Sequence, residues 1–139
     1  MNEKRYPSRF VIIAAEDLRS EGGDKFSIMG VAPSGLPVIE QGGTFLIPCL
    51  AIYANFFDVD GEFDIRLIVE NEGARIFDTP VPAAKISDNS EGNRARANFL
   101  VAGKFMNVKV EKPSKIKVTV KIDEKEYSQS FRLAVAVQE

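Results

Sequence analysis

Apolar and polar residues alternate with a period of two along much of this chain. Nearly every second residue is apolar in segment 63–70, and the same alternation runs through 115–122 and 127–137. Successive side chains of a β-strand point to opposite faces, so each segment predicts a half-exposed antiparallel strand. The polar residues 123–125 separate the last two segments, which we expect to form a hairpin.

Earlier segments have a different pattern. Segment 10–15 is apolar on both faces, which is typical of a central strand covered on both sides, or of a strand at an interface. A strand at 25–31 follows a turn that contains Gly22 and Gly23. Pro48 has no N–H to donate to a ladder, so we expect a bulge or an edge at that point. We place further strands at 44–55, 74–77, 95–102 and 105–111.

Clusters of Gly, Pro, Asn and Ser separate the predicted strands, and no segment has a long run of apolar residues at helical spacing. We therefore predict an all-β protein, a single antiparallel β-sandwich of Ig-like or C2-like type with about seven to nine strands. The 139 residues suit one domain covering residues 1–139. Its most mobile loop is predicted at 87–96, which is long and polar.

The composition excludes several kinds of chemistry. The chain has no histidine and no tryptophan, so triads and metal sites built on imidazole are excluded, and the usual sugar-stacking residue is missing. It also has no glycine-rich phosphate-binding motif. We expect a protein that is not an enzyme and has no cofactor. The single cysteine, Cys49, has apolar neighbours, which favours a buried, inert thiol in a reducing compartment.

The net charge of −2 gives no overall positive field, so nucleic acid is an unfavoured partner. The first nine residues are polar and include no apolar signal segment. The longest apolar stretch, 45–57, is shorter than the roughly 20 residues that a membrane helix needs. We expect a cytoplasmic protein without a membrane partner, or a virion-associated one if it is encoded by a phage.

The most conspicuous polar cluster is an acidic segment around Gly61. Carboxylates at alternate positions of one loop could bind calcium, although the spacing does not fit an EF-hand. Alternatively, Asp60 and Gly61 form a hairpin turn whose neighbours begin the exposed face of the next strand. We therefore predict no metal site, with four weak candidate ligands: Asp58, Asp60, Glu62 and Asp64.

Charge is unevenly distributed. Segment 58–78 is mostly acidic, whereas 104–121 carries six lysines and one glutamate. Lys115, Lys117 and Lys121 either face Glu62, Asp64 and Glu70 across a sheet or form one of two complementary sides of the domain. In the second case these lysines are interface candidates.

Phenylalanine is abundant, with ten copies that fall mostly on the inward phase of the predicted strands. Phe56 and Phe57 are consecutive, so they cannot both point inward on one regular strand. One of them, together with Tyr53, is a candidate interface anchor. The alternative is a bulge that hides both rings.

Two motifs carry a resemblance to a known family: FVIIAAED at 10–17 and KFSIMGV at 25–31, followed by an apolar strand at 45–53 and a closing hairpin at 116–137. With them the chain resembles a domain-of-unknown-function family of small bacterial proteins of similar length. The resemblance implies a β-sandwich and supplies no activity, cofactor or catalytic residue. The polar segment 87–96 and the lysine-rich segment 104–121 depart from the family pattern.

Together these observations predict a non-enzymatic protein–protein interaction module of bacterial or phage origin. It would be either a structural component of an assembly or a small regulator or inhibitor, with a protein partner or a second copy of itself bound at strand edges and loops. The alternative is a sandwich that binds calcium or carbohydrate through the acidic segment 58–64.

Overall fold

The structure is a computed structural model that describes residues 4–22, 25–31, 35–81, 85–87 and 97–135. These residues contain eleven strands and no helix. The strands are β1 (Arg9–Ala15), β2 (Asp17–Ser20), β3 (Phe26–Met29), β4 (Leu36–Gln41), β5 (Thr44–Val59), β6 (Ile65–Asn71), β7 (Ala74–Pro80), β8 (Lys85–Ser87), β9 (Ala97–Val110), β10 (Lys115–Ile122) and β11 (Lys125–Val135). The predicted all-β fold is confirmed.

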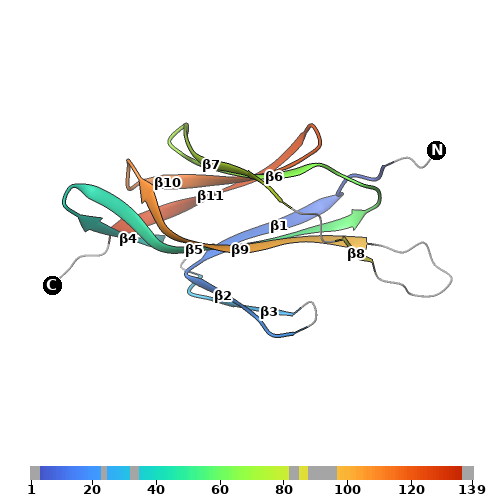
Figure 1. Ribbon diagram of the computed structural model, residues 1–139, viewed down its shortest axis with the longest axis horizontal. Coiled ribbons are helices and arrows are strands. Elements are labelled where there is room, and N and C mark those ends of the chain that lie inside the picture. Colours follow the sequence, from blue (N-terminus) through green and yellow to red (C-terminus); the bar gives the residue numbers. More distant parts are fainter. Residues whose placement is uncertain (1–3, 23–24, 32–34, 82–84, 88–96, 136–139) are drawn as a thin grey trace.

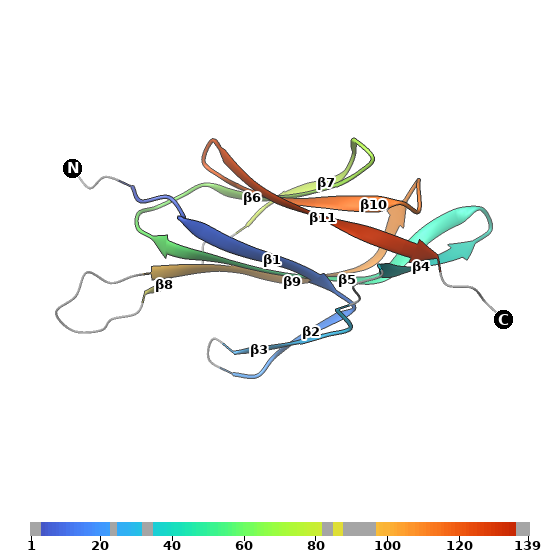
Figure 2. The ribbon, with the colours of Figure 1, turned by 180° about the vertical axis from the view of Figure 1, so that it is seen from behind.

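Two layers form the sandwich. One layer has the strand order β7-β6-β10-β11, and the other has β1 beside β5, followed by β9 and β8 (Figure 1). Seen from behind, β10 and β11 cross above β1, β5 and β9 (Figure 2). This order is that of an immunoglobulin-like sandwich, in which strands A, B, E and D face strands C, F and G.

β4 connects the two layers. It pairs antiparallel with the start of β5 through Ile39 and Leu46, and parallel with the end of β11 through Leu36 and Leu133. Every other pairing in the described residues is antiparallel. The expectation of a purely antiparallel sandwich therefore has one exception, at the crossing strand.

In both long strands, β5 and β9, the alternation of inward and outward side chains shifts by one residue at the same point along the pair. Ile47 and Val108 point into the core as partners, but beyond Cys49 and Met106 the inward residues are Leu50 and Phe105. Along the other edge of β5, β4 pairs only as far as Leu46 and β1 begins at Ala51. Among the residues that the structure describes, Pro48 therefore lies opposite no strand on that edge, which confirms the edge form of the prediction.

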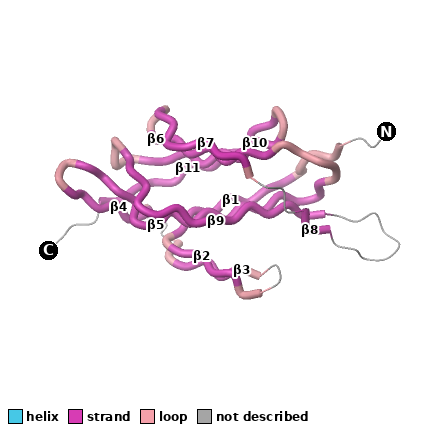
Figure 3. Tube along the Cα trace, viewed as in Figure 1, coloured by secondary structure: helices cyan, strands magenta, loops and turns pink. Residues whose placement is uncertain are grey.

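The β2–β3 hairpin forms a third, small layer on the outer face of the β1-β5-β9 sheet (Figure 3). Leu18 of the hairpin is buried there, together with Ala15 and Ala51 of the sheet. Among the described residues β1 pairs only with β5, so the expectation of a central strand at 10–15 is wrong, while the alternative of a strand at an interface stays a prediction. Its outer residues are apolar because the hairpin, rather than a second neighbouring strand, covers part of that face.

The core lies between the two layers, where the inward residues of β6 and β10 meet those of β5 and β9. Phe56 is fully buried at one end of it and packs against Phe10, Phe99 and Tyr127, with ring centroids 5.5–6.4 Å apart. Aromatic pairs at such distances stabilise beyond the area that they bury. This aromatic cluster joins β1 and β11, the two outermost strands on one side of the sandwich.

Candidate functional site

The edges of the sandwich differ in how they are protected against further strand pairing. The edge strand β7 carries Arg75, Asp78 and Pro80, and the edge strand β8 has only three residues. Charges, proline and short length are the usual devices that prevent pairing with another chain. β1 has seven residues, lacks proline and has its one charge at Arg9. β11 pairs with β4 from Leu133 onward, and within the described residues no strand pairs with that edge of its segment 125–131.

A groove lies between these two unprotected edges. At one end Phe10 of β1 contacts Tyr127 of β11, with ring centroids 5.2 Å apart, and at the other end Leu36 pairs with Leu133. Between the two closures is a cavity of about 370 Å³. Its lining residues are Ile12, Ile13, Ala14, Val31, Leu36, Ser130, Phe131 and Arg132.

The groove is apolar with one cation. Val31 is 56% exposed at the groove, a large value for an apolar side chain in a folded domain. Arg132 is exposed and forms no ion pair with any residue that the structure describes. As far as the described residues go, the groove therefore offers unpaired backbone, apolar contact area and one positive charge without an ion-pair partner.

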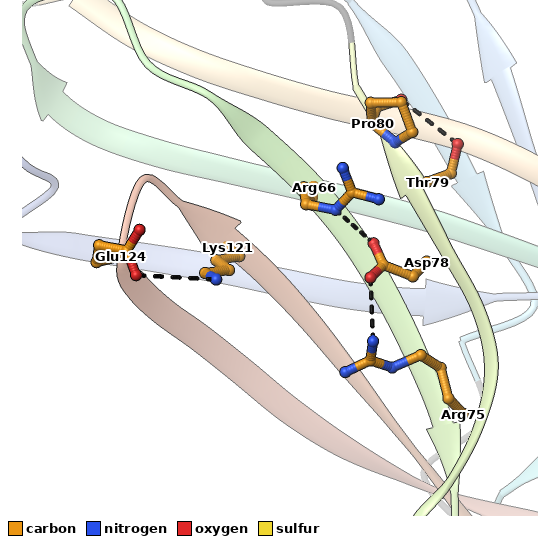
Figure 4. Close-up of polar contacts among 7 residues, drawn as sticks. All are labelled: Arg66, Arg75, Asp78, Thr79, Pro80, Lys121 and Glu124. Carbon is orange, nitrogen blue, oxygen red and sulfur yellow. Dashed lines mark hydrogen bonds and ion pairs between the residues drawn. The ribbon is translucent and has the colours of Figure 1, made fainter.

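The lysine row lies beside this groove, on the outer face of β10. Lys115 is opposite Arg132 of β11, and Lys117 is opposite Glu70 of β6. Lys121 is opposite Arg66 of β6 and Glu126 of β11, and its Nζ lies 4.0 Å from Glu124 (Figure 4). The expectation that these lysines face Glu62, Asp64 and Glu70 across the sheet is therefore confirmed for Lys117 and Glu70 as opposite positions, and is wrong for Lys115 and Lys121.

One acidic residue on the far side of the same sheet already has two cationic partners. Asp78 of β7 accepts a 2.7 Å hydrogen bond from Nε of Arg66 and a 3.1 Å hydrogen bond from Nη1 of Arg75 (Figure 4). Because Asp78 is shared between two arginines on β6 and β7, it does not neutralise the cations on β10 and β11. Positive charge is therefore concentrated toward the groove side, at Lys115 and Arg132.

The acidic segment 58–64 is held by the N-terminal segment. The Asp58 carboxylate accepts a 3.3 Å hydrogen bond from Ser8, and the backbone of Asp60 exchanges hydrogen bonds of 2.7 and 3.0 Å with that of Arg5. Glu62 and Asp64 are exposed. Within the described part of the chain, no three acidic or cysteine side chains come together to hold a metal ion.

Asp123, in the turn between β10 and β11, holds the N-terminal segment and the residue that precedes β6 against this turn by hydrogen bonds. Its carboxylate accepts hydrogen bonds from the backbone N–H of Asp64 (2.9 Å), from Nζ of Lys4 (3.0 Å) and from the hydroxyl of Tyr6 (2.9 Å). The Asp64 N–H, followed by the bonds from Lys4 and Tyr6, lowers the pKa of Asp123, although burial partly opposes the shift. Asp123 therefore anchors the segment that leads into β1.

The aromatic candidates lie on opposite faces of β5. Phe56 is fully buried, so it is a core residue and is not available as an interface anchor. Phe57 is half-buried on the outer face, where the guanidinium carbon of Arg9 lies 4.6 Å from its ring centroid. Tyr53, also half-buried, packs against Phe26 of the β2–β3 hairpin, with ring centroids 6.0 Å apart. The register shift in β5 follows Phe56 and does not hide both rings.

Cys49 is half-buried on β5. Burial, and to a smaller extent the nearby carboxylate of Asp17, raises the pKa of its thiol, while Lys104 acts in the opposite direction. A raised pKa reduces the thiolate fraction at neutral pH and with it the nucleophilicity of the sulfur. This is the environment of a structural cysteine.

Sequence reasoning missed Val31 and Arg132. Val31 is the last residue of a predicted strand and Arg132 lies on the polar phase of another, and neither position is unusual in the sequence. The two come together only because β4 crosses between the layers and leaves part of the β11 edge unpaired. No local signal in the sequence reports that crossing.

Comparisons with known proteins add no assignment. No protein-family model, curated protein or solved structure matches the chain. Among the described residues, no helix has the length and apolar character needed to cross a membrane.

Proposed function

We propose that this protein is a non-enzymatic protein–protein interaction module that binds an extended segment of a partner along the β1–β11 groove. One observation carries the proposal: two unprotected strand edges flank an apolar cavity of about 370 Å³. Unpaired N–H and C=O groups on a strand edge bind an added strand, and neighbouring pockets receive its alternate side chains. The groove has both features, strand-edge backbone groups and an apolar pocket beside them.

The proposed role is a structural component of an assembly or a small regulator or inhibitor, of bacterial or phage origin. The cytoplasm is the proposed compartment, or the virion if the gene belongs to a phage. A half-buried cysteine with a raised pKa is consistent with a reducing environment. The resemblance to a domain-of-unknown-function family is compatible with such a role and does not define it.

Site-specific photo-crosslinking in the native cell tests this proposal. A photoreactive residue at Val31 lies at the groove, and one at Met106, which is 65% exposed and does not line the groove, is the matched control. We expect a discrete crosslinked adduct from position 31 and none from position 106. Equal adducts from both positions, or none from position 31, would overturn the proposal.

A further inference from the structure

We infer that the outer face of β10 and β11 binds an acidic segment of a partner protein through exposed side chains. Three cations define this surface, which we call the cationic face: Lys115 and Lys117 of β10 and Arg132 of β11. Arg132 also lines the cavity of the groove, so the two surfaces are neighbours. The inference goes beyond the proposed function, because binding to the face of a sheet requires no free strand edge.

The pattern of burial places all three cations on one side of the sheet. Ile116 and Val118 are fully buried in the core, so the lysines that alternate with them point away from it. Arg132 is opposite Lys115 in the β10–β11 ladder, and opposite residues share a face. All three cations are exposed. Their Cβ atoms are about 5 Å apart across the ladder and about 7 Å apart along β10.

Among the described residues, no acidic side chain forms an ion pair with the cationic face. Glu70 is opposite Lys117, yet the distance between their charged groups exceeds that of an ion pair. Glu72 reaches the residue before Lys115, but there its carboxylate accepts a 2.6 Å hydrogen bond from the hydroxyl of Ser114. The cationic face therefore has three positive charges without a counterion in the described part of the chain.

This arrangement of charges does not stabilise the fold. Like charges directly opposite each other destabilise a sheet, and Lys115 and Arg132 are such a pair. The other end of the same hairpin differs, because Lys121 is opposite Glu126 and its Nζ lies 4.0 Å from Glu124 (Figure 4). Cations thus have acidic neighbours at one end of β10 and lack them at the other. An anionic partner would supply the missing countercharge.

The extent and composition of the cationic face favour an acidic protein segment over a nucleic acid. A nucleic acid presents phosphates continuously, and beyond the three cations it would meet the carboxylates of Glu124 and Glu126. Bases would also find no aromatic ring to stack on, because the other outward residues at the centre of the two strands are Thr119, Ser128 and Ser130. Carboxylates at alternate positions of an extended segment are about 7 Å apart, as the two lysines are.

Peptide binding to the 139-residue chain tests this inference. The probe is a rhodamine-labelled peptide in which glutamate alternates with serine; it has no apolar residue and so does not depend on the apolar groove. Two labelled molecules are compared with it: the same peptide with glutamine for glutamate, and an oligothymidylate with as many phosphates as the peptide has glutamates. Binding is measured by fluorescence anisotropy at low and at physiological salt.

We expect the glutamate peptide to bind about tenfold more tightly than the glutamine peptide at low salt, and the ratio to fall at physiological salt, because salt screens exposed charges. Lys115→Glu should reduce the ratio to less than about twofold. The same variant should melt at or above the temperature of the native chain, because an opposite-charge pair replaces a like-charge pair. Lys109→Glu is the matched control, since Lys109 is exposed on β9 of the other layer and has no ion pair in the described residues. It should leave the ratio near tenfold.

Three results would overturn the inference. Equal binding of the glutamate and glutamine peptides would show that the cationic face does not select carboxylates. Equal losses in Lys115→Glu and Lys109→Glu would show that the attraction is not located there. Tighter binding of the oligothymidylate than of the glutamate peptide would assign the face to nucleic acid. If Lys115→Glu does not fold, Lys117→Gln against Lys109→Gln gives the same comparison without a new acid in the ladder. The crosslink at position 31 tests the groove and is independent of these outcomes.

Discussion

Asn71, at the end of β6, is the best single test of how the sandwich is held together. Its side chain is 2% exposed and makes four hydrogen bonds, three to the turn between β9 and β10 and one to the first residue of β10. Nδ2 donates to the carbonyls of Lys112 (2.9 Å) and Lys115 (3.0 Å). Oδ1 accepts from the backbone N–H groups of Glu111 (3.1 Å) and Lys112 (3.0 Å). One amide therefore closes a turn about forty residues further along the chain.

The expected loss of stability in the Asn71→Ala variant follows from these four hydrogen bonds. A hydrogen bond contributes about 0.5–1.5 kcal/mol to the net free energy of unfolding, so four bonds give roughly 2–6 kcal/mol. Glu111 and Lys112 are exposed, and water can satisfy part of their backbone after truncation. We therefore expect Asn71→Ala to lower the free energy of unfolding by about 2–4 kcal/mol.

The Asn71→Asp variant tests the hydrogen bonds that residue 71 donates separately from those that it accepts. The carboxylate keeps both accepted bonds but loses both donated bonds and faces two carbonyl oxygens, which should raise its pKa in the folded state. A raised carboxyl pKa means that the ionised form destabilises the fold. The loss relative to the native chain should therefore be largest at pH 7 and smaller near pH 4, where the carboxyl takes up a proton.

Urea denaturation of these variants gives the measurement, with Asn55→Ala as the matched control. Asn55 is a half-buried asparagine whose Oδ1 is buried without a hydrogen-bond partner in the described residues. Its truncation removes no bond from that oxygen and should change stability by less than about 1 kcal/mol. If Asn71→Ala is no more destabilising than Asn55→Ala, the reasoning about the turn is refuted.

Three further predictions concern a glycine, a carboxylate and a metal ion. Gly35→Ala should lower the free energy of unfolding by about 1–3 kcal/mol, because φ is +136° and the new Cβ would lie 3.1 Å from Cβ of Ala134. In thermal melts Gly103→Ala, whose Cβ meets only ordinary contacts, should be close to neutral, and equal losses would contradict the strain argument. The lowered pKa of Asp123 means that its ionised form stabilises the fold above the ordinary value of 3.8, and that this stability is lost as pH falls through the lower folded pKa. Asp123→Asn should therefore lose about 1–2 kcal/mol at pH 7 and progressively less below pH 3.8 in denaturation series, whereas a constant deficit would exclude the linkage. Calcium at millimolar concentration should leave the melting temperature unchanged, and a rise would restore the acidic segment 58–64 as a cation site.

The strands that alternate strictly could be predicted from sequence. The hairpin of β10 and β11 is an example, because each strand has one core face and one exposed face and the turn between them is polar. β4 was missed because its segment is short, contains Pro37 and pairs in parallel with a strand about one hundred residues away. β8 was missed for a similar reason, since three residues are too few for a period to be recognised. The predicted loop 87–96 lies almost wholly outside the described residues.

The candidate site was less predictable than the fold. The prediction of a binding surface at strand edges rests on composition and missing chemistry, and it remains a prediction. Which edge is unprotected depends on where β4 leaves β11, a property of the whole topology. The lysine row could be recognised from spacing alone, yet the partner of each lysine depends on register: Lys117 is opposite an acid, and Lys115 is opposite an arginine.

The link between Asp123 and the N-terminal segment has a consequence for synthesis on the ribosome. Lys4 and Tyr6 are bound by a carboxylate that is 119 and 117 residues further along the chain. At about 5–20 residues per second, that carboxylate is translated roughly 6–24 s after Lys4. During that interval β1 has neither its anchored lead-in nor its contact with Tyr127, and its apolar edge is exposed on the nascent chain. Chaperones that recognise extended apolar segments have that interval in which to bind it, before the last hairpin is complete.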